Sequence, residues 1–326
     1  KKVVSARTLW VKLLQNRMET GEPYLMFEDA VQSDLPEFQK KKGLKVNHSN
    51  LCSEITLATN EERTAVCCLS SVNLEYYDEW KNHPAFIPDL IRFLDNVLTH
   101  FIENAPDELE RAKYSASRER SIGMGTMGFH AYLQKNSIPF EGMVASGVNM
   151  QIFNKIKSEA MIETKRMAVE RGACPDDDTC SVRNAHLLAI APNASSSIIC
   201  GNTSPSVEPY RANAFTQKTK SGSYLMKNKF LEEILEKYES NDDKTWSGII
   251  ANKGSCQHLD FLTDEEREVY KTAVEINQAW VVEHASMRQE YICQSQSINL
   301  FFPPDVSKGD LHNVHMLAWA KNMKTL

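Results

Sequence analysis

The sequence predicts an α/β protein in which short parallel strands alternate with long helices. Apolar runs of strand length recur along the chain, and stretches with helical periodicity separate them, which is typical of parallel α/β architecture. With 326 residues, the chain is long enough for one large α/β unit or for two ordinary domains. A hydrophobic share of 42% and a charged share of 25% are those of a globular protein.

Several stretches show the helical pattern. The first begins at Ser5, a suitable N-cap, and Gly21 can close it. Pro88 lies in the first turn of the second, where its missing N–H costs nothing. A capping box opens a long helix at Thr263, and Asp310 caps the last one. The predicted helices cover residues 5–20, 87–102, 145–171, 263–280 and 310–323.

Short apolar runs predict the strands, and a long polar loop follows the first of them. This loop, from residue 28 to 47, contains the helix breakers Pro36 and Gly43. A loop of that length inside a compact domain is usually functional or mobile. The predicted strands cover residues 23–27, 64–69, 186–190 and 298–302.

The charge and the apolar runs argue against some classes of function. A formal net charge of -6 is not that of a general nucleic-acid binder, because phosphate contacts need clustered Lys and Arg. No apolar run approaches the roughly 20 residues that cross a bilayer, and no signal-peptide pattern is present. The eight cysteines are too sparse for a secreted disulfide scaffold. We therefore expect a cytoplasmic protein with neither a nucleic-acid nor a membrane partner.

The strongest candidate site residues follow directly after this loop and are Asn50, Cys52 and Glu54. If this segment is extended, the three side chains point to one side, because extended chain has a side-chain period of two. One face then carries a hydrogen-bonding amide, a redox-capable sulfur and a base. The alternative is that Cys52 is a small buried hydrophobe, as a single cysteine in an apolar run usually is.

Two further segments are candidates. Cys67 and Cys68 are adjacent thiols in a predicted strand, where neighbouring side chains face opposite ways, so only one can look into a site. After the strand at 186–190, the segment 192–196 forms a turn of small hydroxyl residues before a helix, which can offer backbone N–H groups to an anion. An ordinary N-cap with spare serines is the alternative for the latter.

Other patterns carry less chemistry. Residues 123–128 match G-x-G-x-x-G, but the preceding 117–120 make a poor strand, so close backbone packing is favoured over a dinucleotide turn. The acidic run 176–178 lacks the spacing of a calcium loop and predicts a solvated turn. His312 and His315 are predicted to be partly exposed helix residues, and no metal site is expected.

Two types of chemistry fit these residues. A hydrolase could use Cys52 as nucleophile and one of nine histidines as base, although nothing selects any one histidine. Radical or redox chemistry on a phosphorylated substrate would account for more of the candidate residues. It combines Cys52 with Glu54 and Asn50, a second thiol in Cys67, and a phosphate-binding turn.

A set of spaced motifs, in order along the chain, resembles the large, catalytic subunit of class I ribonucleotide reductase. The agreement covers essentially the whole chain, and it is specific because several motifs agree at once. The motifs are SNLCSEI at 49–55, CCLSSVNL at 67–74, RERSIG at 118–123, PNASSS at 192–197, VEP at 207–209 and QSQSINL at 294–300.

The resemblance implies a fold. The family has a ten-stranded α/β barrel made of two five-stranded halves, with a finger loop through its middle. This chain resembles the second, C-terminal half across 1–326, with the finger loop at about 28–66 carrying the radical cysteine. The first half-barrel, and any ATP-cone domain, would lie before this stretch.

The resemblance also implies roles for the site residues. Cys52 matches the cysteine that becomes a thiyl radical and takes the 3′ hydrogen of a ribonucleotide. Glu54 matches the base for the 3′-OH proton, and Asn50 matches the amide that holds the substrate hydroxyls. Cys67, rather than Cys68, matches one of two thiols that reduce the substrate. The implied substrate-binding residues are Asn50, Leu51, Cys52, Glu54, Pro192, Asn193, Ala194, Ser195 and Ser196.

Partners and reductants follow from the same resemblance. The other reductive cysteine and the sites for ATP and dNTP effectors belong to the first half, and a second large subunit is expected. A metal-containing small subunit supplies the radical, and a dithiol protein of the thioredoxin or glutaredoxin type re-reduces the site. The family's radical-transfer tyrosines follow a Lys-Thr-Leu like the one ending at Leu326. We therefore expect a split or truncated subunit, inactive alone, that acts on diphosphates. A purely structural half-barrel is the alternative.

Overall fold

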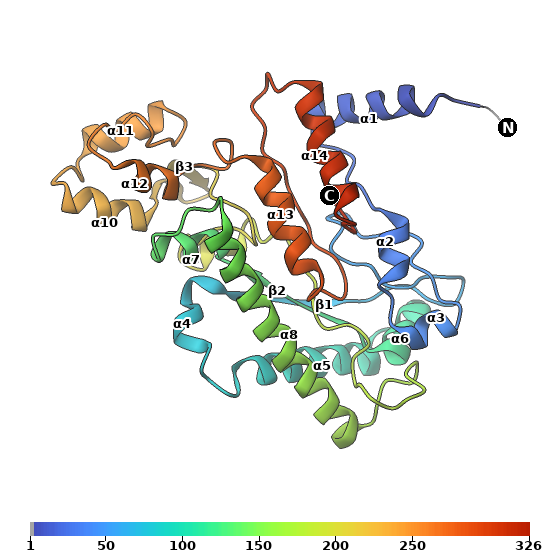
Figure 1. The fold of residues 1–326 in the computed structure, drawn as a ribbon. Helices are drawn as coiled ribbons and strands as arrows, with labels where there is room; N and C mark the ends of the chain where they lie inside the picture. Colours follow the sequence, from blue (N-terminus) through green and yellow to red (C-terminus); the bar gives the residue numbers. More distant parts are fainter. Residues whose placement is uncertain (1–2) are drawn as a thin grey trace.

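The structure is a computed structural model that describes residues 3–326, so residues 1 and 2 of the predicted domain lie outside the described residues. Long helices surround a small parallel sheet (Figure 1). The helices are α1 (Ala6–Thr20), α2 (Glu28–Ser33), α3 (Glu37–Lys41), α4 (Tyr77–Trp80), α5 (Phe86–Asn104), α6 (Glu110–Glu119), α7 (Phe129–Lys135), α8 (Met143–Arg171), α9 (Ser196–Ile199), α10 (Lys229–Lys237), α11 (Asp243–Ala251), α12 (Asp264–Val269), α13 (Gln278–Gln289) and α14 (Lys308–Ala320), with 3-10 turns at Leu74–Tyr76 and Asp107–Leu109.

The parallel sheet is the frame of the molecule. Strand β1 (Cys68–Asn73) pairs with β2 (Ile122–Met127) in parallel, so that Cys68 lies opposite Ile122. Two extended segments continue the row through isolated parallel bridges, Met124 with Leu188 and Ile190 with Gln296. The row therefore runs from β1 through β2 and the segment near 190 to the segment near 296, which agrees with the predicted parallel α/β class.

Close packing explains the glycines of β2. A Cβ added at Gly123 would lie 2.5 Å from the Leu69 side chain and 2.8 Å from the Cys67 sulfur. At Gly125 it would lie 2.5 Å from the carbonyl oxygen of Ala189. Residues 122–127 are fully buried strand, not a phosphate-binding turn, so the packing interpretation of the G-x-G-x-x-G run is confirmed.

Helices α5 and α8 cover the sheet and carry much of the main core (Figure 1). Leu94 and Leu98 of α5 are fully buried and meet Ile152 and Ile156 of α8 in one cluster with the strands. A second cluster lies under the antiparallel hairpin β3 (Ala214–Thr219) and β4 (Gly222–Lys227), where α10, α11 and α12 pack together. No sequence pattern predicted this hairpin. None of the helices in the described part of the chain is long and apolar enough to span a membrane.

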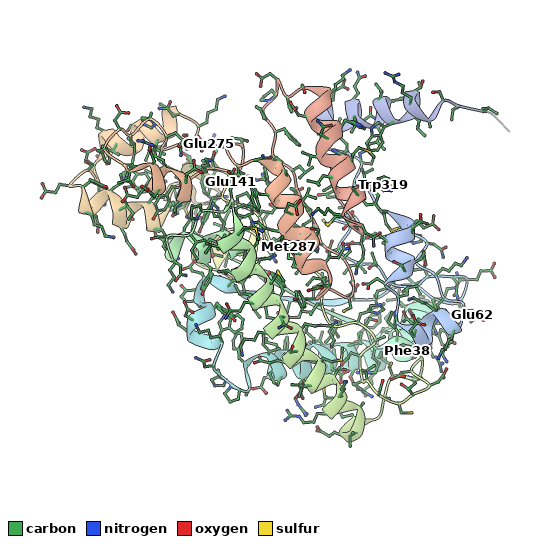
Figure 2. All side chains as sticks on the ribbon, in the orientation of Figure 1. Phe38, Glu62, Glu141, Glu275, Met287 and Trp319 are labelled. Carbon is green, nitrogen blue, oxygen red and sulfur yellow. The ribbon has the colours of Figure 1, made fainter. Side chains whose placement is uncertain are left out.

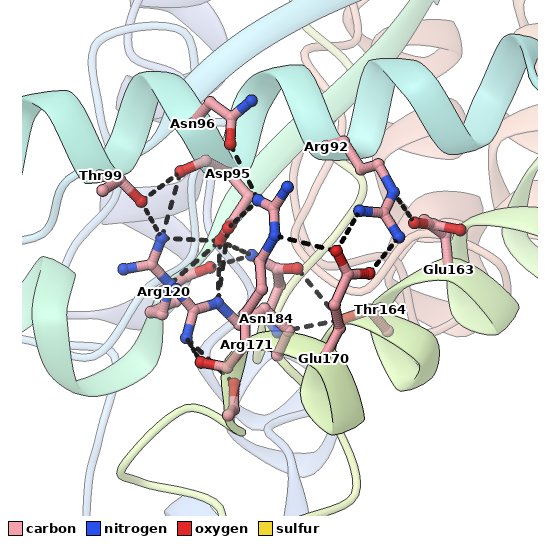
Figure 3. A network of polar contacts seen from close by, with 12 residues as sticks. Arg92, Asp95, Asn96, Thr99, Arg120, Glu163, Thr164, Glu170, Arg171 and Asn184 are labelled. Atoms are coloured by element: carbon pink, nitrogen blue, oxygen red, sulfur yellow. Dashed lines mark hydrogen bonds and ion pairs between the residues drawn. The ribbon is translucent and has the colours of Figure 1, made fainter.

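A buried carboxylate ties four elements together beside the core (Figure 3). Asp95 of α5 pairs with Arg120 at 2.7 Å, with Arg171 at 3.3 Å and with Arg183 at 3.4 Å, and it accepts a hydrogen bond from Asn184. Burial by itself would raise the pKa of Asp95, but the arginines bring it below its usual value. The cluster joins α5, the end of α6, the end of α8 and the chain at 183–184.

Several predicted helices are confirmed. The Ser5 hydroxyl accepts a hydrogen bond from the Thr8 N–H and Gly21 closes α1 in the left-handed conformation. The helices predicted at 87–102 and 145–171 are α5 and α8, each within a few residues of the expected bounds. Capping residues and apolar periodicity are local signals, so they predict these helices without any knowledge of the tertiary structure.

Other boundaries were wrong. The polar loop at 28–47 contains α2 and α3, and the strand predicted at 64–69 begins only at Cys68. The helix opened by Thr263 ends at Val269, well short of the predicted residue 280, and the Ala273 N–H beyond it donates to the carbonyl of Tyr210 in another segment. The last helix is capped by the Ser307 hydroxyl, not by Asp310.

The polar side chains at 176–178 and on α14 are more buried than predicted. Asp176 is completely buried and makes a two-bond ion pair with Arg63, so the acidic run is not a solvated turn. Asp177 is buried as well, and only Asp178 is exposed. His315 is 1% exposed and packs edge-on against the ring of Trp10, which corrects its predicted exposure.

Candidate active site

The segment around Cys52 is a closed turn, so the prediction of an extended strand with three side chains on one face is wrong. Ser53 has a left-handed backbone (φ 66°), and its N–H donates to the carbonyl of Asn50 at 3.2 Å. The Asn50 side-chain oxygen then accepts from the Ile55 N–H at 3.1 Å. The turn leaves Leu51 exposed at its tip and Cys52 half-buried.

Glu54 lies at the base of this turn with its carboxylate turned inward. The residue is 3% exposed, and its Oε2 atom is buried without a hydrogen-bond partner in the described part of the chain. Its backbone carbonyl accepts from the Ser295 N–H at 2.9 Å, which fastens the turn to the extended segment near 296. A buried carboxylate oxygen without a donor is unfavourable by itself, and such an atom is suited to take a hydrogen bond or a proton from a ligand.

Cys52 is held as a neutral thiol. Burial raises its pKa, and the charges of Glu54 and Glu22 raise it further. A nucleophilic cysteine of a hydrolase needs the opposite, a pKa lowered by a cationic neighbour or by a histidine base. Among residues 3–326, no histidine hydrogen-bonds to Cys52. The environment therefore favours chemistry on an S–H bond over attack by a thiolate.

A cleft of about 760 Å³ brings two of the predicted residues together. Asn50 contributes to one side of it, and Cys67 and Leu69 contribute from the start of β1. Cys67 packs with Ile55, Leu57 and Ala189, whereas Cys68 packs against the main core. The two adjacent thiols thus face opposite ways, as predicted.

The turn at 192–196 lies elsewhere on the frame and does not line that cleft. The Asn193 side chain donates to the Ser71 hydroxyl at 2.9 Å and to the Thr126 carbonyl at 3.2 Å, which places the turn near the carboxyl ends of β1 and β2. Asn193 has a left-handed backbone (φ 52°), and a single turn of helix, α9, follows. Within the described residues, the N–H groups of Ala194 and Ser195 donate to no backbone acceptor.

Three residues near Cys52 had no predicted role. The Tyr24 hydroxyl donates to the Asn299 side chain at 3.5 Å, and the Asn299 amide donates to Glu208. Burial raises the pKa of Glu208 to about 7. Burial also raises the pKa of Tyr24, and Cys52 is the neighbour that adds most to this. The VEP and QSQSINL motifs contain Glu208 and Asn299, but sequence alone gave no reason to join them to Tyr24.

The carboxyl ends of parallel strands, where the Asn193 turn lies, are where α/β folds bind ligands. The family model described as ribonucleotide reductase, barrel domain, matches residues 1–180 and 176–326. The chain belongs to this family. Its fold is accordingly an α/β barrel fold, and the resemblance based on sequence motifs is confirmed.

Named relatives support the same family assignment. The chain is similar to the ribonucleoside-diphosphate reductase large subunit of Invertebrate iridescent virus 3, 46% identical over 329 residues that cover 100% of this chain and 52% of the relative. It is also similar to the ribonucleoside-diphosphate reductase large chain of Cryptosporidium parvum. That relative is 31% identical over 362 residues that cover 100% of this chain and 44% of the relative. The chain thus spans about half the length of these curated relatives.

A solved structure of the family has the same fold. The class Id ribonucleotide reductase alpha subunit of Actinobacillus ureae superposes with a TM-score of 0.92 at 40% sequence identity. The match covers 98% of this chain and 60% of that subunit. Within residues 3–326, no group of three or more His, Cys, Asp or Glu side chains is arranged to hold a metal ion.

Proposed function

We propose that this chain is the C-terminal half of the catalytic barrel of a ribonucleotide reductase large subunit, and that it reduces ribonucleoside diphosphates only within the complete enzyme. The barrel domain would cover 1–326, with the finger loop at about 28–66. The family membership, the parallel row of strands and the names of the relatives support this assignment. Oxidoreductase chemistry of this kind supplies deoxyribonucleotides for DNA synthesis.

The observation that carries the proposal is the buried, unpartnered Oε2 atom of Glu54 next to a neutral Cys52 thiol. In the proposed reaction, a Cys52 thiyl radical removes the 3′ hydrogen atom of the ribose. Glu54 accepts the 3′-OH proton, which makes the 2′ C–O bond labile, and Asn50 holds the hydroxyls. The 2′ hydroxyl takes a proton from a reducing thiol and leaves as water, and at the end Cys52 returns its hydrogen atom to the 3′ carbon. The radical itself would come from a metal-containing small subunit.

Cys67 is proposed as one of two reducing thiols. Two thiols supply two electrons and two protons to the substrate and become one disulfide. The second thiol would come from the first half-barrel. In the described part of the chain β1 pairs only with β2, so its other edge is open to a further strand. A thioredoxin-type or glutaredoxin-type protein would restore the thiols.

The turn at Pro192–Ser196 is proposed to bind the substrate phosphates. Its exposed serines and the N–H groups of Ala194 and Ser195 lie near the carboxyl ends of β1 and β2. Backbone N–H groups in such a turn attract anions. With Leu51 at the tip of the Cys52 turn, these residues would complete the substrate site.

The surface offers apolar side chains to further subunits. Trp319 on α14 is 62% exposed (Figure 2), and Leu9 on the neighbouring α1 is 60% exposed. We propose that the first half-barrel, which would also carry the effector sites, and the other subunits cover surfaces of this kind. All eight cysteines are free, which fits a reducing cytoplasm.

The test is a Cys52→Ser variant of the complete large subunit, assayed for ribonucleoside diphosphate reduction with its small subunit. Turnover should fall to background, because a hydroxyl cannot replace the thiyl radical, while the free energy of unfolding stays within about 1 kcal/mol of the unmodified protein. Cys180→Ser, on an exposed loop, is the control and should retain activity. Near-normal turnover by the Cys52 variant would exclude the proposal.

A further inference from the structure

The sulfur of Cys67 sits in a tight and mostly apolar slot. It lies against Gly123, where an added Cβ would come within 2.8 Å of the sulfur, and its side chain packs with Ile55, Leu57 and Ala189. On its open side the residue lines the large cleft. Burial raises the pKa of Cys67, so forming a thiolate in this slot is unfavourable unless a donor faces it.

One amide faces the sulfur. The Nε2 group of Gln294 donates to the Cys67 sulfur at 3.2 Å and to the carbonyl oxygen of Ile122 at 3.0 Å. This second bond fixes which way the amide points, since a flipped amide would set Oε1 against the Ile122 carbonyl, two acceptors facing each other. Both hydrogens of the Gln294 amide are therefore used, and one of them is aimed at sulfur.

The backbone of Gln294 is locked as well. Its N–H donates to the Leu188 carbonyl at 3.1 Å, and its own carbonyl accepts from the ammonium of Lys324, which is 2% exposed. Lys324 also donates to the carbonyl of Ile292 at 2.7 Å. The Oε1 atom of Gln294 is buried without a partner among the described residues, so the amide keeps an arrangement that leaves one oxygen unsatisfied.

We propose that Gln294 is a positioning residue that directs the Cys67 thiol and stabilises its thiolate through the Nε2–H to sulfur bond. A hydrogen bond to a charged acceptor is stronger than one to a neutral acceptor, so the bond favours loss of the thiol proton. Cys68 faces the other way and packs against the main core, which makes Cys67 the selected thiol of the pair. This inference rests on the proposed reductant role of Cys67.

Alkylation by iodoacetamide tests it in the full-length large subunit. The Cys67 thiolate displaces iodide, the S–C bond forms, and the thiol proton passes to the buffer. Rates for individual cysteines are measured by mass spectrometry of peptides between pH 7 and pH 10. In Gln294→Met, which keeps the size but has no donor, Cys67 should react about 10- to 100-fold more slowly at each pH, as expected for one lost bond to a thiolate.

Cys68 is the matched control, because it is the adjacent residue and does not touch Gln294. Its rate should stay unchanged; a rise in both rates would mean that the region has loosened and would count against the inference. Gln294→Asn, with its amide drawn back by one methylene, gives a second variant if the Met variant fails to fold, and it should slow Cys67 as well. An unchanged Cys67 rate beside an unchanged Cys68 rate would overturn the inference.

The reductant role is tested separately. If alkylation of Cys67 slows as expected but a Cys67→Ser enzyme still performs multiple turnovers, the hydrogen bond acts as proposed and the assignment of Cys67 as reductant fails. If Cys67→Ser blocks turnover but Gln294 variants alkylate normally, the reductant assignment stands and the role of Gln294 fails.

Discussion

Replacing Glu119 by glutamine is expected to stabilise the protein at alkaline pH and much less at acid pH. Glu119 is completely buried, with Ser115 at 3.0 Å and Gln39 at 3.2 Å from its carboxylate. Burial raises its pKa from 4.5 to about 7, despite those hydrogen bonds and the charge of Arg63. The folded state therefore binds this proton more tightly, and stability is lost as pH rises from 4.5 through 7.

The size of the effect follows from that gap. At about 1.4 kcal/mol per pH unit, the ionised carboxylate costs about 3 kcal/mol at pH 8 and about 1 kcal/mol at pH 5.5. Glutamine has nearly the same shape and cannot ionise. The advantage of Glu119→Gln over the unmodified protein should therefore grow by about 2 kcal/mol between the two pH values.

Urea unfolding of both proteins at pH 5.5 and pH 8 measures this difference. Comparing them at the same pH cancels other titrations, such as that of Asp95, whose lowered pKa weakens both proteins in acid. Glu110→Gln, on the exposed face of the same helix, is the control and should show no growth. A Glu119→Gln advantage that stays constant between the two pH values would refute the reasoning.

Three further outcomes are expected. Asp95→Ala leaves three arginines without their carboxylate and should cost about 3–5 kcal/mol in urea unfolding, whereas Asp178→Ala, which removes an exposed pair with Lys42, should cost less than about 1 kcal/mol. Gly123→Ala should cost about 1–3 kcal/mol by forcing Leu69 and Cys67 aside, whereas Gly147→Ala, with no atom nearby, should not destabilise. In the complete enzyme, Cys67→Ser should block multiple turnovers driven by a dithiol and Cys68→Ser should not; the reverse pattern would reassign the reducing thiol.

The sequence was most informative where the signal is local. Ser5 and Gly21 bounded α1 because capping depends on a few neighbouring residues. The opposite facing of Cys67 and Cys68 followed from the alternation of side chains along extended chain. The family was visible from ordered motifs, because a motif is a property of the chain and not of its packing.

The sequence failed where a distant segment decides the outcome. The turn at Asn50–Ile55 depends on the Asn50 side chain accepting a hydrogen bond from the Ile55 N–H. The alternation of side chains along an extended chain does not predict such a contact. Asp176 resembles a solvated acid until Arg63, far along the chain, buries it. The helix at Thr263 ends at Val269, and four residues further on the Ala273 N–H donates to the carbonyl of Tyr210 in a distant segment.

The sequence by itself determined the α/β class, the long helices α5 and α8, the glycine packing of β2 and the family to which the chain belongs. Only the tertiary structure decided that Glu54 keeps a buried oxygen without a partner, that Asn50 and Cys67 line one cleft, and that Gln294 faces the Cys67 sulfur. Those features are distances between atoms far apart in the chain. They arise from burial and from the hydrogen bonds that buried groups must find, which a linear pattern does not encode.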